Sequence, residues 1–109
     1  MRQRGTCCEL PVPTDDGWAQ ERAALLKALA DPTRLSMVAA LRTTSGPICI
    51  CDFTATYDLS QPTISHHMAK LRSAGLVESS RHGIWVYYQL RPDLPAGVAR
   101  LLEAVLAAV

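Results

Sequence analysis

Apolar residues recur at helical spacing in the first half of the chain, and each stretch is bounded by residues that start or stop helices. Residues 18–30 consist mainly of strong helix formers, which predicts a first helix. Asp31 then suits the position before a new helix and Pro32 suits its first turn, so a second helix is expected to follow and to end in the segment 43–47. The apolar positions are Trp18, Leu25, Leu26 and Leu29 in the first helix and Leu35, Val38 and Leu41 in the second.

Two further helices are predicted over residues 49–57 and 60–75, with only a short connection between them. Ser60 is a good N-cap for the second of these helices, and Gly75 is a suitable stop. Each helix has one apolar face, made of Ile50, Phe53 and Tyr57 in one and of Ile64, Met68 and Leu71 in the other. Two helices joined by so short a turn are typical of a helix-turn-helix unit.

After Gly75 the period changes from that of a helix to that of a strand. Residues 76–80 and 84–90 are rich in β-forming residues and flank Arg81, His82 and Gly83, which predicts a β-hairpin with a basic tip.

Residues 94–109 are nearly all aliphatic and predict a last helix. A helix this apolar has more hydrophobic face than so small a domain can cover, so we expect it to pack against a second copy of the chain.

The length and composition fit one globular domain. The chain has 109 residues, of which 49% are hydrophobic and 19% charged. Residues 1–17 have no apolar period and are expected to form a mobile arm, ahead of a domain spanning residues 18–109. No apolar run approaches the roughly 18 residues that cross a bilayer, and the N-terminus lacks the apolar stretch of a signal peptide. We therefore expect a cytoplasmic protein that does not contact the membrane.

The net charge of +1 indicates nothing about nucleic acid, but its distribution does. Residues 60–91 carry four basic side chains, one acidic side chain and all three histidines, whereas residues 18–58 are balanced. Polar side chains of the predicted helix 60–75 that do not belong to its apolar face could hydrogen-bond base edges or phosphates. The alternative is a solvated face that binds nothing. The candidates for DNA contact are Ser60, Gln61, Thr63, Ser65 and His66, with Lys70, Arg72, Arg81 and His82 as phosphate contacts.

Four cysteines fall in two close pairs, Cys7 with Cys8 and Cys49 with Cys51. In a reducing compartment such thiols stay free, and thiolates select soft ions such as As(III), Sb(III), Cd(II), Pb(II), Zn(II) and Cu(I). In a regular helix Cys49 and Cys51 point about 200° apart, so they can hold one ion only if the backbone there is not helical. Two sulfurs are too few for these ions, so the arm must supply the rest.

A histidine site for a metal is not expected. His66 and His67 point about 100° apart on a helix, and neither has a cysteine or carboxylate four residues further on.

Enzymatic chemistry is not expected either, because the chain lacks a CxxC motif in a βαβ context, a deaminase motif and a phosphate-binding loop. A winged-helix module that binds only protein remains an alternative to a DNA-binding protein.

Several strings of residues resemble the ArsR/SmtB family of metal-responsive bacterial repressors. They are residues 28–35 (ALADPTRL), 59–68 (LSQPTISHHM) and 74–77 (AGLV), and the similarity extends from about residue 18 to residue 94. Residues 48–53 (ICICDF) also resemble the metal-binding segment of the arsenite and cadmium/lead sensing branches. The resemblance implies a mainly α, homodimeric winged helix-turn-helix protein with a β-hairpin wing. It also implies a repressor that leaves its operator DNA when a thiophilic ion binds.

The resemblance further implies which cysteines hold the ion. Arsenite-sensing relatives often carry a third cysteine where this chain has Thr54, so Cys7 or Cys8 becomes a needed ligand, as in the cadmium/lead branch with its N-terminal cysteine arm. We expect As(III) or Sb(III) as the inducer, with Cd(II), Pb(II) or Zn(II) as the alternative. A thiol redox switch that bridges the arm to residues 49–51 is a further alternative. The zinc site that some relatives form on the last helix is not expected, because that helix has no histidine.

Overall fold

A computed structural model describes residues 10–12 and 17–107 of the chain. Helices dominate this part, and a small antiparallel sheet completes it, so the predicted mainly α fold with a β-hairpin wing is confirmed. In chain order the elements are α2 (Gly17–Leu29), α3 (Pro32–Thr43), β1 (Ile48–Cys49), α4 (Ile50–Tyr57), α5 (Gln61–Ser73), β2 (Val77–His82), β3 (Trp85–Leu90) and α6 (Ala96–Leu106).

The predicted helix starts are where capping chemistry places them. The Asp31 carboxylate accepts a hydrogen bond of 2.9 Å from the backbone N–H of Arg34, and Pro32 is the first residue of α3. This hydrogen bond lowers the pKa of Asp31. Ser60 caps α5 in the same way through Thr63. Both α3 and α5 therefore begin at a side chain that binds a free backbone amide of the first turn.

The sheet has one strand more than the sequence predicted. Ile48 and Cys49 form β1, which pairs with Tyr88 and Tyr87 of β3, so the strand order is β1-β3-β2. The predicted helix over residues 49–57 is wrong at its first residue, because Cys49 has extended backbone angles and serves as the N-cap of α4. A strand of two residues is too short to produce a period in the sequence.

The tip of the hairpin also differs from the prediction. Arg81 and His82 were expected in the turn, but they belong to β2 and pair with Val86 and Trp85. The turn itself is formed by Gly83, with a φ of 65°, and Ile84. Glycine tolerates this left-handed conformation, which explains why the strands reverse there. The basic side chains therefore lie beside the tip, on strand backbone.

The core lies where α2, α3, α4 and α5 meet the base of the hairpin. The apolar face predicted for α5 is confirmed, since Ile64, Met68 and Leu71 have no exposed surface. In α3 the central core residue is Met37, which is fully buried, whereas the predicted Leu35 is only partly buried. Periodic spacing of leucine and valine did not reveal this methionine.

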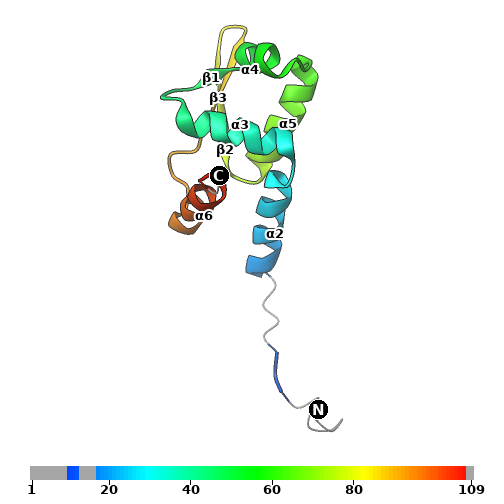
Figure 1. Cartoon of the computed structure of the whole chain (residues 1–109), viewed down its shortest axis with the longest axis vertical. Coiled ribbons are helices and arrows are strands. Elements are labelled where there is room, and N and C mark those ends of the chain that lie inside the picture. The colour runs from blue at the N-terminus through cyan, green and yellow to red at the C-terminus, as the bar shows by residue number, and fades with distance from the viewer. Residues whose placement is uncertain (1–9, 13–16, 108–109) are drawn as a thin grey trace.

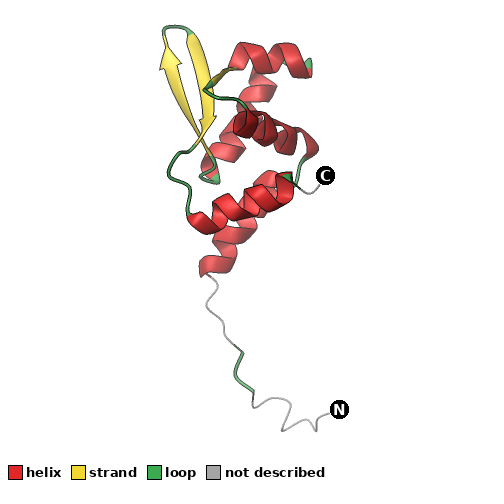
Figure 2. Ribbon diagram, turned by 60° about the vertical axis from the view of Figure 1, so that its left-hand side comes forward, coloured by secondary structure: helices red, strands yellow, loops and turns green. Residues whose placement is uncertain are grey.

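The hairpin and the helices α2 and α6 occupy opposite ends of the molecule (Figures 1 and 2). The hairpin stands next to α4 and α5 at one end, and α2 and α6 lie at the other. The last helix is shorter than the predicted range 94–109, and it buries Val98 and Leu102. Within the described part of the chain, no helix is long and apolar enough to span a bilayer.

Candidate functional site

The outer face of α5 carries the polar residues that the sequence singled out. Because Ile64, Met68 and Leu71 bind the helix to the core, Gln61, Thr63 and His66 are exposed. Ser65 is half-buried, and Ser60 stands at the N-cap. The Ser60 hydroxyl lies 2.9 Å from that of Thr63, so these two side chains are hydrogen-bonded to each other at the start of the helix. The exposed polar groups gather at the N-terminal half of α5, the part of a recognition helix that enters the major groove.

One flank of α5 faces the hairpin. The Arg72 guanidinium donates a hydrogen bond of 3.3 Å to the hydroxyl of Ser79 on β2, which connects the helix to the wing. Further along the hairpin, Arg81 and His82 are exposed, and the His82 ring packs edge-on against Tyr87 with 5.3 Å between ring centroids. Basic side chains therefore continue from α5 along the wing.

The other flank of α5 faces the junction between α2 and α3, where Arg34 makes several contacts. Its side chain donates to the carbonyl oxygens of Ala28 at 2.7 Å and Lys27 at 3.5 Å, both in the last turn of α2. It also lies 3.3 Å from Nδ1 of His67, which must accept because a guanidinium only donates. Arg34 thus joins α2, α3 and α5. Sequence reasoning did not single out this arginine.

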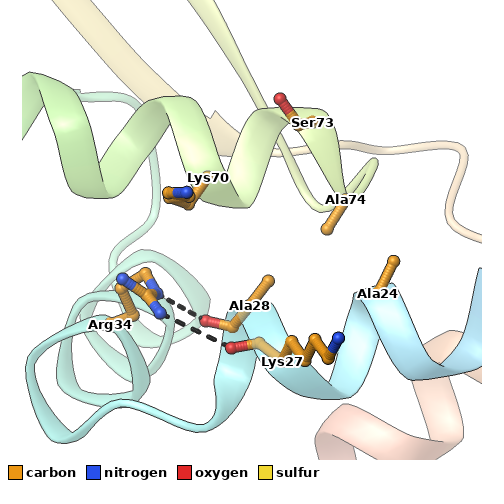
Figure 3. A pocket seen from close by; sticks show the side chains of 7 residues that line it. All are labelled: Ala24, Lys27, Ala28, Arg34, Lys70, Ser73 and Ala74. Carbon is orange, nitrogen blue, oxygen red and sulfur yellow. Dashed lines mark hydrogen bonds between the residues drawn. The ribbon is translucent and has the colours of Figure 1, made fainter.

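A hollow of about 310 Å³ opens on this same flank (Figure 3). Three basic residues line it, each from a different helix: Lys27 from α2, Arg34 from α3 and Lys70 from α5. The alanines at positions 24, 28 and 74 supply much of the remaining wall, and no carboxylate lines it. The charge count along the sequence could not reveal this cluster, because Lys27 and Arg34 lie in the balanced segment 18–58.

The sulfur atoms of Cys49 and Cys51 lie together at the start of α4. Cys49 ends β1 with φ −68° and ψ 142°, and Cys51 lies in the first helical turn. The Cys51 thiol donates to the Cys49 sulfur across 2.7 Å, and the Cys51 backbone N–H lies 3.4 Å from that sulfur. The backbone at Cys49 is therefore not helical, which is the condition under which the two sulfurs could share an ion. Cys49 is buried and Cys51 is exposed, so an ion could approach from one side.

The contact between the sulfurs affects the protonation of Cys51. The hydrogen bond between Cys51 and Cys49 raises the pKa of the Cys51 thiol. Partial desolvation and the charge of Asp52 act in the same direction. The Cys51 thiol is therefore protonated at neutral pH in the free protein, and a bound ion must replace its proton.

The pair does not complete a metal site by itself. Among the described residues, no group of three or more histidine, cysteine, aspartate or glutamate side chains could hold a metal ion. Thr54 directs its hydroxyl to the carbonyl oxygen of Cys51 at 2.8 Å. Cys7 and Cys8, the other predicted ligands, lie outside the described residues.

Comparison with known proteins shows close relatives. Residues 31–79 match the family described as bacterial regulatory protein, arsR family. The chain is 44% identical over 84 residues to the arsenic resistance transcriptional regulator ArsR1 of Pseudomonas putida. This alignment covers 77% of this chain and 65% of the relative. It is also 44% identical over 79 residues to the arsenical resistance operon repressor of Escherichia coli, which covers 72% of this chain and 67% of that protein.

The fold has solved counterparts as well. A homodimeric winged helix-turn-helix DNA-binding domain from Mycobacterium bovis, a possible ArsR-family transcriptional regulator, superposes with a TM-score of 0.70 at 28% sequence identity. The superposition covers 91% of this chain and 89% of the solved one.

Proposed function

The chain belongs to the arsR family of bacterial regulatory proteins, which are DNA-binding regulators and not enzymes, and we propose that it is a homodimeric repressor induced by As(III) or Sb(III). In this proposal Cys49, Cys51 and one or both of Cys7 and Cys8 bind the ion. Ion binding then weakens the grip of the dimer on operator DNA in the cytoplasm. The choice of ion is supported by the 44% identity to the Pseudomonas relative, an arsenic resistance regulator; the match spans 65% of the length of that relative.

For DNA binding, the proposed contacts follow from exposure. Gln61, Thr63, Ser65 and His66 would face base edges and nearby phosphates, with Ser60 at the helix start. The phosphate contacts would be Lys70, Arg72, Arg81 and His82, all of which are exposed. The buried stripe beneath them supports the proposal, since it holds α5 rigidly in the orientation that exposes these groups.

Apolar side chains at the far end of the molecule favour a homodimer. Trp18 and Leu26 of α2 are 64% and 52% exposed, and Val105 of α6 is 40% exposed. The two helices lie together at the end away from the hairpin (Figure 2). An isologous contact through them would bury this apolar surface and present two copies of α5 to successive major grooves.

The observation that carries the inducer proposal is the contact between the Cys49 and Cys51 sulfurs, 2.7 Å apart on one side of the backbone. Trivalent arsenic and antimony take three sulfurs, so the pair supplies two ligands and leaves one position to be filled. Thr54 is engaged with the backbone and is a poor ligand for such an ion. The two cysteines of the segment 1–17 are the remaining thiols of this chain.

The position of the pair also gives a route from ion to DNA. Cys49 lies on β1, which pairs with Tyr87 in the wing, whereas Cys51 lies on α4, which packs against α5. One ion held by both sulfurs and by the arm would join the wing, α4 and the arm. By linkage, a thousandfold loss of DNA affinity, about 4 kcal/mol, requires bound DNA to weaken ion binding equally.

Proton balance separates arsenic from the divalent ions. Arsenous acid, As(OH)3, exchanges its three hydroxides for three thiolates; the three S–H protons leave with the hydroxides as three water molecules. Cd(II), Pb(II) or Zn(II) instead releases one proton for each thiol that it binds. The raised pKa of Cys51 makes this difference measurable, because its thiol starts protonated. Calorimetry in buffers of different ionisation enthalpy counts the protons.

The proposal is tested by measuring the affinity of the reduced protein for operator DNA from upstream of its gene, with and without arsenite, at fixed salt. We expect a loss of about a thousandfold on saturation. Unchanged affinity would reject arsenite as the inducer. Release by Cd(II), Pb(II) or Zn(II) instead, with protons released, would support the divalent alternative.

A thiol redox switch is the second candidate, because Cys51 is exposed and lies against a second sulfur. In that case a two-electron oxidant would join Cys49 or Cys51 to an arm cysteine with loss of two protons and two electrons. DNA affinity would then change with oxidant and be restored by reductant in the absence of any ion.

A further inference from the structure

The geometry points to a second DNA-backbone site in this protein, on the flank of α5 opposite the wing. We infer that the hollow formed by Lys27, Arg34 and Lys70 holds a phosphodiester group of the DNA (Figure 3). This inference rests on the proposed mode of DNA binding through α5, and it adds residues from α2 and α3 to that interface.

The composition of the hollow identifies the class of ligand. Three cations from three helices line a space of about 310 Å³, and no carboxylate is among the lining residues. Within the described part of the chain, the ion pairs are Arg42 with Glu103 and Arg91 with Asp93, so neither lysine ammonium is paired with a carboxylate. Uncompensated cations on a surface attract a phosphate.

The arginine is fixed, whereas the lysines are free to adjust. Two backbone carbonyl oxygens at the end of α2 hold the Arg34 side chain, which lies 3.3 Å from His67 of α5. Binding of a phosphate therefore does not require the Arg34 side chain to be ordered first. Lys27 and Lys70 are exposed at the edge, where their flexible ammonium groups can reach a phosphate oxygen.

The hollow is continuous with the proposed DNA-binding face. Lys70 follows Thr63 by seven residues, or two helical turns, so both lie along the same side of α5. Arg72 lies on the opposite flank, where it bonds to Ser79 of the wing. With α5 in the major groove, one phosphate backbone would face the wing and the other would face the hollow.

The test measures the salt dependence of binding to a 30-base-pair duplex of random sequence, which isolates backbone contacts. Because Lys70 already belongs to the proposed phosphate contacts, the reference is Lys70→Gln. We expect the double variant Lys27→Gln, Lys70→Gln to flatten the slope of log K against log[salt] beyond that of Lys70→Gln by about 0.9 per subunit, or about 1.8 for a dimer. The same variant should weaken specific and random duplexes equally. Arg34 is left intact because it caps α2.

The matched control is Arg100→Gln, which removes one positive charge from α6, away from the hollow. A slope for the double variant equal to that of Lys70→Gln would overturn the inference, as would a further flattening no larger than the one that Arg100→Gln causes. So would a hollow that binds only free anion, seen as thermal stabilisation by inorganic phosphate in the wild-type protein with no change of slope in the variant. If the wild-type protein itself shows no salt-dependent DNA binding, the proposed function fails instead.

Discussion

The two helices of the helix-turn-helix unit differ in how much of their function their own residues supply. α5 is held by three side chains without exposed surface, and its polar face is complete within thirteen residues. The start of α4 offers two sulfurs, one buried and one exposed, and in the proposed function a third would come from a distant part of the chain. Under that proposal the DNA-binding face of α5 is already formed in the free protein, whereas the ion site is completed only when the arm supplies its ligand.

The largest expected effect separates these two regions. Cys51→Ser should leave DNA affinity unchanged and should reduce the effect of arsenite on it from about a thousandfold to less than about threefold. The serine oxygen is a poor ligand for a soft ion. Fluorescence anisotropy with labelled DNA, with reductant present, measures both affinities.

Cys49→Ser should behave in the same way, but Cys49 belongs to the core, so its folding must be checked by circular dichroism. Thr54→Ser is the matched control, since it keeps the hydroxyl that donates to the Cys51 carbonyl oxygen. Normal release from DNA by both cysteine variants would contradict the assignment of these ligands.

A core substitution in α5 should have the next largest effect, and on stability. Met68 is fully buried, and Met68→Ala should lower the free energy of unfolding by about 2–5 kcal/mol because it leaves a cavity. His66→Ala, on the exposed face of the same helix, should change it by less than about 0.5 kcal/mol. Urea unfolding measures both values. Equal losses would show that α5 is not anchored by its apolar stripe.

The smallest expected effect lies outside both regions, at the start of α3. The hydrogen bond from the Arg34 N–H lowers the pKa of Asp31 below its usual value of 3.8. A lowered pKa means that the folded state favours the charged form, so this stabilisation is present above about pH 3.8 and is lost as the pH falls through the lower folded pKa.

Asp31→Asn tests this, because asparagine also caps helices but carries no charge. The wild-type protein should be the more stable of the two at neutral pH, and the difference should shrink below about pH 3.8. Urea unfolding at several pH values measures it. A difference that does not depend on pH would contradict the assigned role of the carboxylate.

The same contrast explains what the sequence could predict. The caps Asp31 and Ser60 and the stripe of α5 were predictable because capping and periodic burial are local. The extended backbone at Cys49 was predicted only as a condition for shared ion binding. The strand that produces it depends on pairing with Tyr87 and Tyr88, which are distant in the sequence.

Contacts between distant elements were not predictable. In the sequence, Arg34 is one of several charges in a segment with equal numbers of acidic and basic residues. In the structure it caps α2 and lies next to His67 on α5. Lys27 and Lys70 are 43 positions apart and meet only because α2 packs beside α5. No spacing rule joins such residues, since their proximity comes from the packing of whole helices.

In the proposed function, sulfurs from two distant parts of the chain hold one ion. X-ray absorption at the arsenic edge, on the reduced protein loaded with one equivalent of arsenite, counts the ligands directly. We expect three sulfur neighbours in the wild-type protein, and two sulfurs with one oxygen when Cys7 and Cys8 are both replaced by serine. Identical spectra for the two proteins would contradict a shared site.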